Sequence, residues 1–212
     1  MDEIVPLPLA LLDLVPVICF MIGGWYLGQT AGKLCHSRSR RMALLGAGLV
    51  ALGGTATAMA KLGAAAGLGS LDPMGEALFI FQTPGFLLLL AVAIQMLRAE
   101  RKPSPKPNPA LMLVAWKITL IALMALAGTA LHGILVTIAL GRKERAAAAG
   151  FAVALLCLLA MGGAARGAQT LTMQWVEESI NTLGQLGFAF GSVLLYRKIS
   201  AHTPGTSPRP AA

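Results

Sequence analysis

The sequence predicts an all-α membrane protein with about six transmembrane helices, and it raises the hypothesis of two three-helix repeats in inverted topology. Of the 212 residues, 56% are hydrophobic and 12% are charged, and the mean hydropathy is +0.72. The chain therefore has too few polar side chains to cover a water-soluble globule. Six apolar stretches reach the length of about 20 residues with which a helix crosses a bilayer. The second half of the chain also resembles the first at one ungapped offset.

Each apolar stretch is expected to be a helix, because backbone polar groups inside a bilayer must be satisfied within their own segment. The stretches are Ile4–Leu27, Met42–Leu62, Met74–Leu97, Ala110–Leu140, Ala146–Ala165 and Met173–Leu195. The first follows the acidic start Met1-Asp2-Glu3 and lacks the basic region and cleavage site of a secretory signal peptide. We therefore expect it to remain as a span.

A run of alternating prolines from Pro103 to Pro109 divides the chain, because it favours a semi-rigid extended spacer. We accordingly predict a first three-helix half over 1–102, a linker over 103–109, a second half over 110–200 and a disordered tail over 201–212. The stretch 110–140 would be about 46 Å long at 1.5 Å per residue, more than one crossing requires. We expect a long tilted helix, and a break near Gly128 or His132-Gly133 is the alternative.

The repeat hypothesis comes from an offset of 102 positions. At this offset Arg40-Arg41 aligns with Arg142-Lys143, Gly48 with Gly150, Glu76 with Glu178, and Gly85-Phe86 with Gly187-Phe188. Repeated blocks of three spans are common in proteins that move solutes. A chain rich in Ala, Leu and Gly also gives chance matches, so the alignment is a hypothesis about the fold.

An odd number of spans in each half inverts the second copy, and this conflicts with the distribution of basic residues. With the N-terminus outside, most basic residues of the first half lie in cytoplasmic loops, as the positive-inside rule requires. The basic loops around Arg142 and Arg197 then fall outside, with only Arg166 inside. We take the N-terminus as outside because the first half has the stronger bias. Glu76 and Glu178 are then expected at opposite membrane faces.

The last stretch has the strongest polar pattern. Gln174, Glu178, Asn181 and Gln185 recur at spacings of four, three and four, which places them on one helical face. A stripe of this kind is costly against lipid, so it should face the bundle interior or water. We predict Glu178, Asn181 and Gln185 as the path of a solute or ion.

By the offset, Glu76 and Thr83 are the counterparts of Glu178 and Gln185 in the first half. The alternative for both acids is a structural role, because each lies in the first turns of its helix, where the macrodipole favours acids. On roughly the opposite side of the last stretch, Gly184, Gly187 and Gly191 are suited to packing a neighbouring helix or a second copy of the chain.

Two further polar residues lie inside predicted spans. Asp13 precedes Pro16, which should loosen the helix, and at this depth its carboxylate must pair, become protonated or reach water. Lys117 is the candidate partner, although its long stem can also reach the interface. His132 has no HxxxH, HExxH or Cys/His pattern around it, so we interpret it as a packing histidine and predict no metal site.

These observations favour a small transporter or channel for an ion or small solute, in the inner membrane of a bacterium. The net charge of +8 lies at span ends, which fits membrane topology and not nucleic-acid binding. The lipid bilayer is the expected partner, and neither a cofactor nor a catalytic residue is predicted. Two alternatives remain: a non-catalytic accessory or assembly subunit, and a membrane-embedded lipid-modifying enzyme that uses an acid with His132.

Overall fold

The computed structural model describes residues 6–68, 72–100, 118–164 and 170–201, and these contain seven α-helices and no strand. For 72–77, 118–121 and 163–164 the description covers the backbone only. The predicted linker 103–109, Lys117, and the predicted tail from residue 202 onward lie outside the described residues. So does the side chain of Glu76.

Within the described residues, every predicted stretch coincides with helix except at Pro6 and at Asp13. Residues 4–5, 110–117 and 165 of the predicted stretches lie outside the described residues. The elements are α1 (Leu7–Leu12), α2 (Leu14–Leu34), α3 (Ser37–Ala65), α4 (Asp72–Glu100), α5 (Ile118–Gly141), α6 (Arg145–Ala164) and α7 (Leu171–Ala201). Among the described residues five helical segments are long and apolar enough to cross a membrane, with α1 and α2 together forming the first. The helix α7 is long enough, but its polar stripe lowers its hydropathy. The chain is thus an integral membrane protein by the length and composition of its helices.

The first span is interrupted at Asp13, which lies between α1 and α2. The cause is Pro16, because proline has no N–H to donate to the carbonyl of Leu12 four residues earlier, and its ring crowds that carbonyl. The predicted loosening before Pro16 is confirmed. It leaves Asp13 at a joint close to one end of the bundle.

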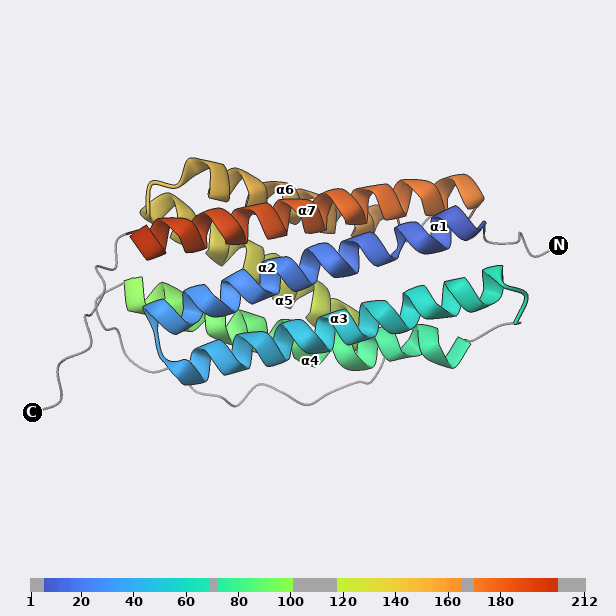
Figure 1. The fold of residues 1–212 in the computed structure, drawn as a ribbon, viewed down its shortest axis with the longest axis horizontal. Coiled ribbons are helices and arrows are strands. Elements are labelled where there is room, and N and C mark those ends of the chain that lie inside the picture. Colours follow the sequence, from blue (N-terminus) through green and yellow to red (C-terminus); the bar gives the residue numbers. More distant parts are fainter. Residues whose placement is uncertain (1–5, 69–71, 101–117, 165–169, 202–212) are drawn as a thin grey trace, which may run out of the picture.

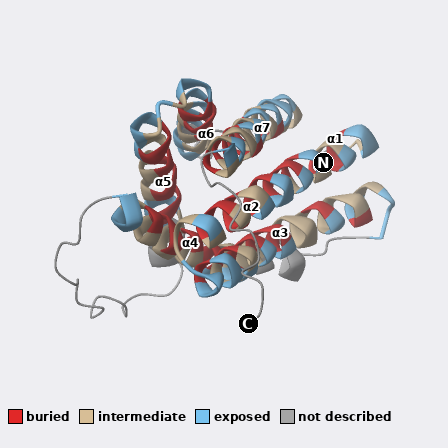
Figure 2. Cartoon of the chain, turned by 60° about the vertical axis from the view of Figure 1, so that its left-hand side comes forward, coloured by how far each residue is buried: buried red, intermediate tan, exposed pale blue. Residues whose placement is uncertain are grey.

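The long helices α2 to α7 close a ring. Each packs against the next in sequence order, and α7 packs against α2 (Figure 2). Buried residues face the interior, where Phe20 contacts both Phe86 and Phe188. Apolar side chains also cover the outside, since Leu126 is 67% exposed and Leu156 is 66% exposed. An outer surface of this kind is suited to lipid.

Glycine pairs hold two of the helix contacts close. A Cβ on Gly150 would lie 2.7 Å from the carbonyl oxygen of Gly187, and a Cβ on Gly187 would lie equally close to that of Gly150. Gly46 of α3 and Gly85 of α4 meet in the same way at 2.8 Å. The glycine face of α7 thus packs a neighbouring helix, as predicted. That neighbour is α6 of the same chain, so this face is already occupied and is not open to a second copy.

The two halves run in the same direction (Figure 1). Lys33 in the last turn of α2 donates to Ser200 in the last turn of α7, at 2.8 Å. Arg142, which follows α5, pairs with Glu100, the last residue of α4, at 2.6 Å. The helices α2, α4, α5 and α7 therefore end together, at what we call the basic end, and α3 and α6 run the opposite way.

The inverted arrangement expected from the sequence is not observed. Glu76 and Glu178 lie in the first turns of α4 and α7, and hence at the same end, which we call the cluster end. The expected inversion counted the connection between α4 and α5 as a loop at one membrane face. In the structure Glu100 and Ile118, the described residues on either side of this connection, lie at opposite ends of the bundle.

Candidate functional site, a buried ion cluster

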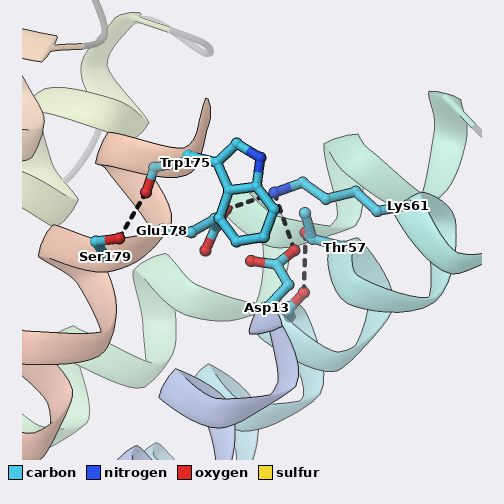
Figure 3. A network of polar contacts seen from close by, with 7 residues as sticks. Asp13, Thr57, Lys61, Trp175, Glu178 and Ser179 are labelled. Carbon is cyan, nitrogen blue, oxygen red and sulfur yellow. Dashed lines mark hydrogen bonds and ion pairs between the residues drawn. The ribbon is translucent and has the colours of Figure 1, made fainter. Parts of the chain in front are cut away.

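Three charged side chains meet at the cluster end, around the ammonium of Lys61. Its Nζ lies 2.5 Å from Oε1 of Glu178 and 3.0 Å from Oδ2 of Asp13. Figure 3 shows the ammonium between the two carboxylates. The Asp13 and Glu178 side chains are 9% and 10% exposed, and that of Lys61 is 29% exposed. Two carboxylates around one ammonium give the cluster a net negative charge when all three groups are ionised.

Helix direction brings these residues together. Asp13 lies at the joint before α2 and Glu178 lies two turns into α7, so both are near the beginning of their spans. Lys61 lies in the second-last turn of α3, which runs antiparallel to α2 and α7. Its four-carbon stem can cover apolar surface while the ammonium reaches both carboxylates. Three helical segments far apart in the sequence thus build one site.

The cluster has more acceptor capacity than its single ammonium satisfies. Glu178 accepts a hydrogen bond from Lys61 through Oε1, whereas its Oε2 is buried without a hydrogen-bond partner among the described residues. Oδ2 of Asp13 is within ion-pair distance of Lys61 but without hydrogen-bond geometry. Buried charges are costly unless paired and hydrogen-bonded. A proton or a further cation would therefore reduce the cost of this arrangement.

Neighbouring hydroxyl groups bond to their own helices. Ser179 donates to the carbonyl oxygen of Trp175 at 2.7 Å, and Thr57 donates to that of Gly53 at 3.2 Å. The indole of Trp175 lies beside Glu178 and is 37% exposed, so it borders the cluster on the α7 side (Figure 3). The acceptor capacity of the site consequently belongs to the carboxylates.

The sequence patterns predicted both acids as intramembrane polar residues but gave no role to Lys61, at the end of the predicted span Met42–Leu62. Asp13 was expected to need a partner, and the candidate was Lys117, which lies outside the described residues. The sequence signal that could have found Lys61 is its depth in the membrane relative to Asp13. An acid near the start of one span and a lysine near the end of the next lie at the same membrane face, because consecutive spans are antiparallel.

The other predicted path residues are only partly brought together. Asn181 and Gln185 are half-buried on α7, one and two turns further into the span than Glu178. Thr83 is buried in α4, and its hydroxyl has no hydrogen-bond partner among the described residues. Because α4 packs against α3 and α5, while α7 packs against α6 and α2, Thr83 does not join the polar stripe of α7.

His132 lies in the ring interior and has the contacts of a packing histidine. Its Nδ1 is 2.7 Å from the carbonyl oxygen of Gly128, and its ring meets the Phe188 ring edge-on at a centroid distance of 5.7 Å. Phe188 is ten residues, or about 15 Å of helix, beyond Glu178. Within the described ranges, no group of three or more His, Cys, Asp or Glu residues could hold a metal ion.

No protein-family model, no curated protein and no solved structure matches this chain. The function of the chain is therefore inferred from its own geometry.

Proposed function

We propose that this chain is a small membrane transporter or channel in which the Asp13–Lys61–Glu178 cluster binds a cation or carries a proton. The observation that supports this most directly is Oε2 of buried Glu178, which has no hydrogen-bond partner among the described residues although its cluster holds two acids and one base. Ionisable groups inside spans are expensive and usually belong to ion or proton paths. The net negative charge favours a cation over an anion.

The chemistry of the cluster has two states. With Glu178 ionised, Lys61 is shared between two carboxylates. When Glu178 takes up a proton, or a cation replaces the ammonium beside it, Lys61 keeps Asp13 as its partner. The flexible stem of Lys61 allows the ammonium to shift between these positions. Such a change in the pairing of Lys61 is how the cluster would accept and release one charge.

The ring architecture adds support. The units α2–α4 and α5–α7 have the same helix order and direction, and the glycine pairs Gly46–Gly85 and Gly150–Gly187 hold equivalent helix pairs. We extend the proposal to two parallel three-helix repeats, in place of inverted ones. Parallel repeats related by an axis along the membrane normal are an architecture of known solute transporters.

The ion cluster itself is not repeated. At the offset of 102, Asp13 corresponds to Ala115 and Lys61 corresponds to Gly163. Packing glycines and the phenylalanines at 86 and 188 fit a duplicated scaffold, whereas the charged trio is particular to α1–α3 and α7. A feature that departs from the scaffold in this way is better explained by a site than by packing. Short loops fit the inner membrane of a bacterium, which we include in the proposal.

Reconstitution into liposomes tests the proposal. Proton or monovalent cation flux down an imposed gradient is measured for the wild type, for Glu178→Gln and for the control Glu177→Gln, which changes the adjacent carboxylate on a different helical face. We expect Glu178→Gln to abolish flux or its pH dependence while expression is retained, and Glu177→Gln to resemble the wild type. Wild-type flux in Glu178→Gln would overturn the assignment of the site.

The same experiment addresses the alternative function. A wild-type protein that is folded in liposomes and conducts none of the tested cations, and that co-purifies stoichiometrically with another membrane protein, would favour the accessory-subunit hypothesis over transport.

A further inference from the structure

Basic residues from distant parts of the sequence gather at the basic end of the bundle. Lys33 at the end of α2 and Arg38, Arg40 and Arg41 at the start of α3 are all exposed. Exposed Lys143 and Arg145 flank the junction of α5 and α6, and exposed Arg197 lies near the end of α7. The described acids at this end are Glu100, which is paired with Arg142, and Glu144, so basic residues outnumber them. This end therefore has a strong positive field.

One corner of the basic end is organised by contacts among α2, α3 and α7. Lys33 donates to Ser200, and its Nζ lies 4.8 Å from the ring centroid of Tyr196. The stem of Arg40 lies over Gly32, where a Cβ would be 3.2 Å from the Arg40 Cβ. Because a lysine ammonium has three donors and Ser200 takes one, donors of Lys33 remain for a further acceptor beside Arg40. We call Lys33, Arg40 and Arg197 the basic corner.

Two tyrosines fix the depth of this corner. The rings of Tyr26 and Tyr196 lie together at a centroid distance of 5.4 Å. Tyr26 precedes Lys33 by seven residues, or about 10 Å along the helix. Tyrosines are enriched where a membrane meets water, with their rings at headgroup level. Lys33 and Arg40 thus lie at or just beyond the depth of lipid phosphates.

We infer that the basic corner binds the headgroup of an anionic phospholipid and that the basic end faces the cytoplasm. A phosphodiester accepts hydrogen bonds from both lysine and arginine, and anionic lipids of the cytoplasmic leaflet attract basic residues beside a span. Both halves place their described basic turns at this end, so one orientation satisfies the positive-inside rule for the described residues of both halves. This inference does not depend on what the ion cluster does.

Lipid-dependent stability tests the inference. The full chain is placed in nanodiscs of phosphatidylcholine, with and without phosphatidylglycerol, and the thermal midpoint and the number of retained lipids are measured. Lys33→Gln/Arg40→Gln is compared with Lys143→Gln/Arg145→Gln, which removes the same charge at the α5–α6 turn. We expect phosphatidylglycerol to raise the wild-type midpoint. Each removed hydrogen bond to the phosphate should weaken lipid binding about tenfold, which corresponds to about 1.5 kcal/mol for a hydrogen bond to a charged group.

The double variant at the corner should therefore lose most of the increase in midpoint, and the control should keep most of it. Equal losses in both variants would overturn a specific corner site, because they would indicate diffuse attraction. If inorganic phosphate raised the thermal midpoint in phosphatidylcholine nanodiscs as much as phosphatidylglycerol does, the assignment of a lipid as the ligand would be overturned. If the corner variant does not fold, Arg40→Gln alone keeps the Lys33 contacts with α7 and should still bind the lipid about tenfold more weakly.

Discussion

The two ends of the bundle use charged residues in opposite ways. At the cluster end, the carboxylates of Asp13 and Glu178 are withdrawn from water and share the partly exposed ammonium of Lys61. At the basic end, the exposed charges are mostly positive and are stabilised by solvent. Desolvation makes a buried charge costly without a partner, whereas an exposed charge is already stabilised by water. Removing one charge should thus lower the free energy of unfolding strongly at the cluster end and only slightly at the basic end.

The largest expected effect is all-or-none and concerns the side of the membrane from which each end of the bundle is accessible. In a chain with Cys19, Cys35 and Cys157 replaced, we expect Ser37→Cys and Glu144→Cys to react with an impermeant maleimide from one side of the membrane. Leu68→Cys, at the cluster end, should react from the other side. The parallel arrangement of the halves would be wrong if Ser37→Cys and Glu144→Cys reacted from opposite sides.

The next largest effect is the loss of stability expected when the ammonium of Lys61 is removed from the cluster end. Lys61→Met leaves two buried carboxylates without a counter-ion and should lower the free energy of unfolding by about 3–5 kcal/mol. Unfolding in detergent micelles with increasing denaturant measures the loss. The triple variant Asp13→Asn/Lys61→Met/Glu178→Gln should recover most of it, because no charge remains to be compensated. A triple variant no more stable than Lys61→Met would contradict the ion-pair explanation.

An intermediate loss of stability is expected when a side chain is added where α6 and α7 pack closely. A Cβ at Gly150 would lie 2.7 Å from the carbonyl oxygen of Gly187, so Gly150→Ala should lower the free energy of unfolding by about 1–3 kcal/mol. Gly48 is the matched control, since a Cβ there meets nothing within 4 Å. Gly48→Ala should be neutral or raise stability by up to about 1 kcal/mol, because alanine is the better helix former. The same micelle unfolding assay applies, and equal effects would argue against the glycine contact.

The smallest effect is expected at the exposed ion pair of the basic end. Glu100→Gln removes the partner of Arg142 and should cost less than about 1 kcal/mol, with a loss that shrinks as salt is added. Denaturant unfolding at low and high salt provides the comparison with Lys61→Met. A cost at Glu100 as large as that at Lys61 would remove the distinction between the two ends.

Local chemistry made much of the fold predictable. Apolar length predicted each helix, Pro16 predicted the break at Asp13, and the glycine spacing of α7 predicted a packing face. These depend on backbone hydrogen bonding, hydropathy and residue size, which are properties of neighbouring residues. For the same reason the sequence could state that Asp13 needs a partner, since the cost of an unpaired buried carboxylate does not depend on the fold.

Which residues meet was decided by tertiary structure. The direction of α5 relative to α4 could not be obtained from hydropathy, because hydropathy records that a segment can span a membrane and not which way it runs. The sequence-based topology instead assumed that successive spans alternate in direction, with a loop at one membrane face between α4 and α5. This assumption placed Glu76 and Glu178 at opposite faces. Lys61 was overlooked in the same way, because its role exists only where α1, α3 and α7 meet. By itself the sequence determined the helices and the cost of their buried charges. The assignment of partners depended on packing between segments 48 and 117 residues apart, whose contacts no local pattern records.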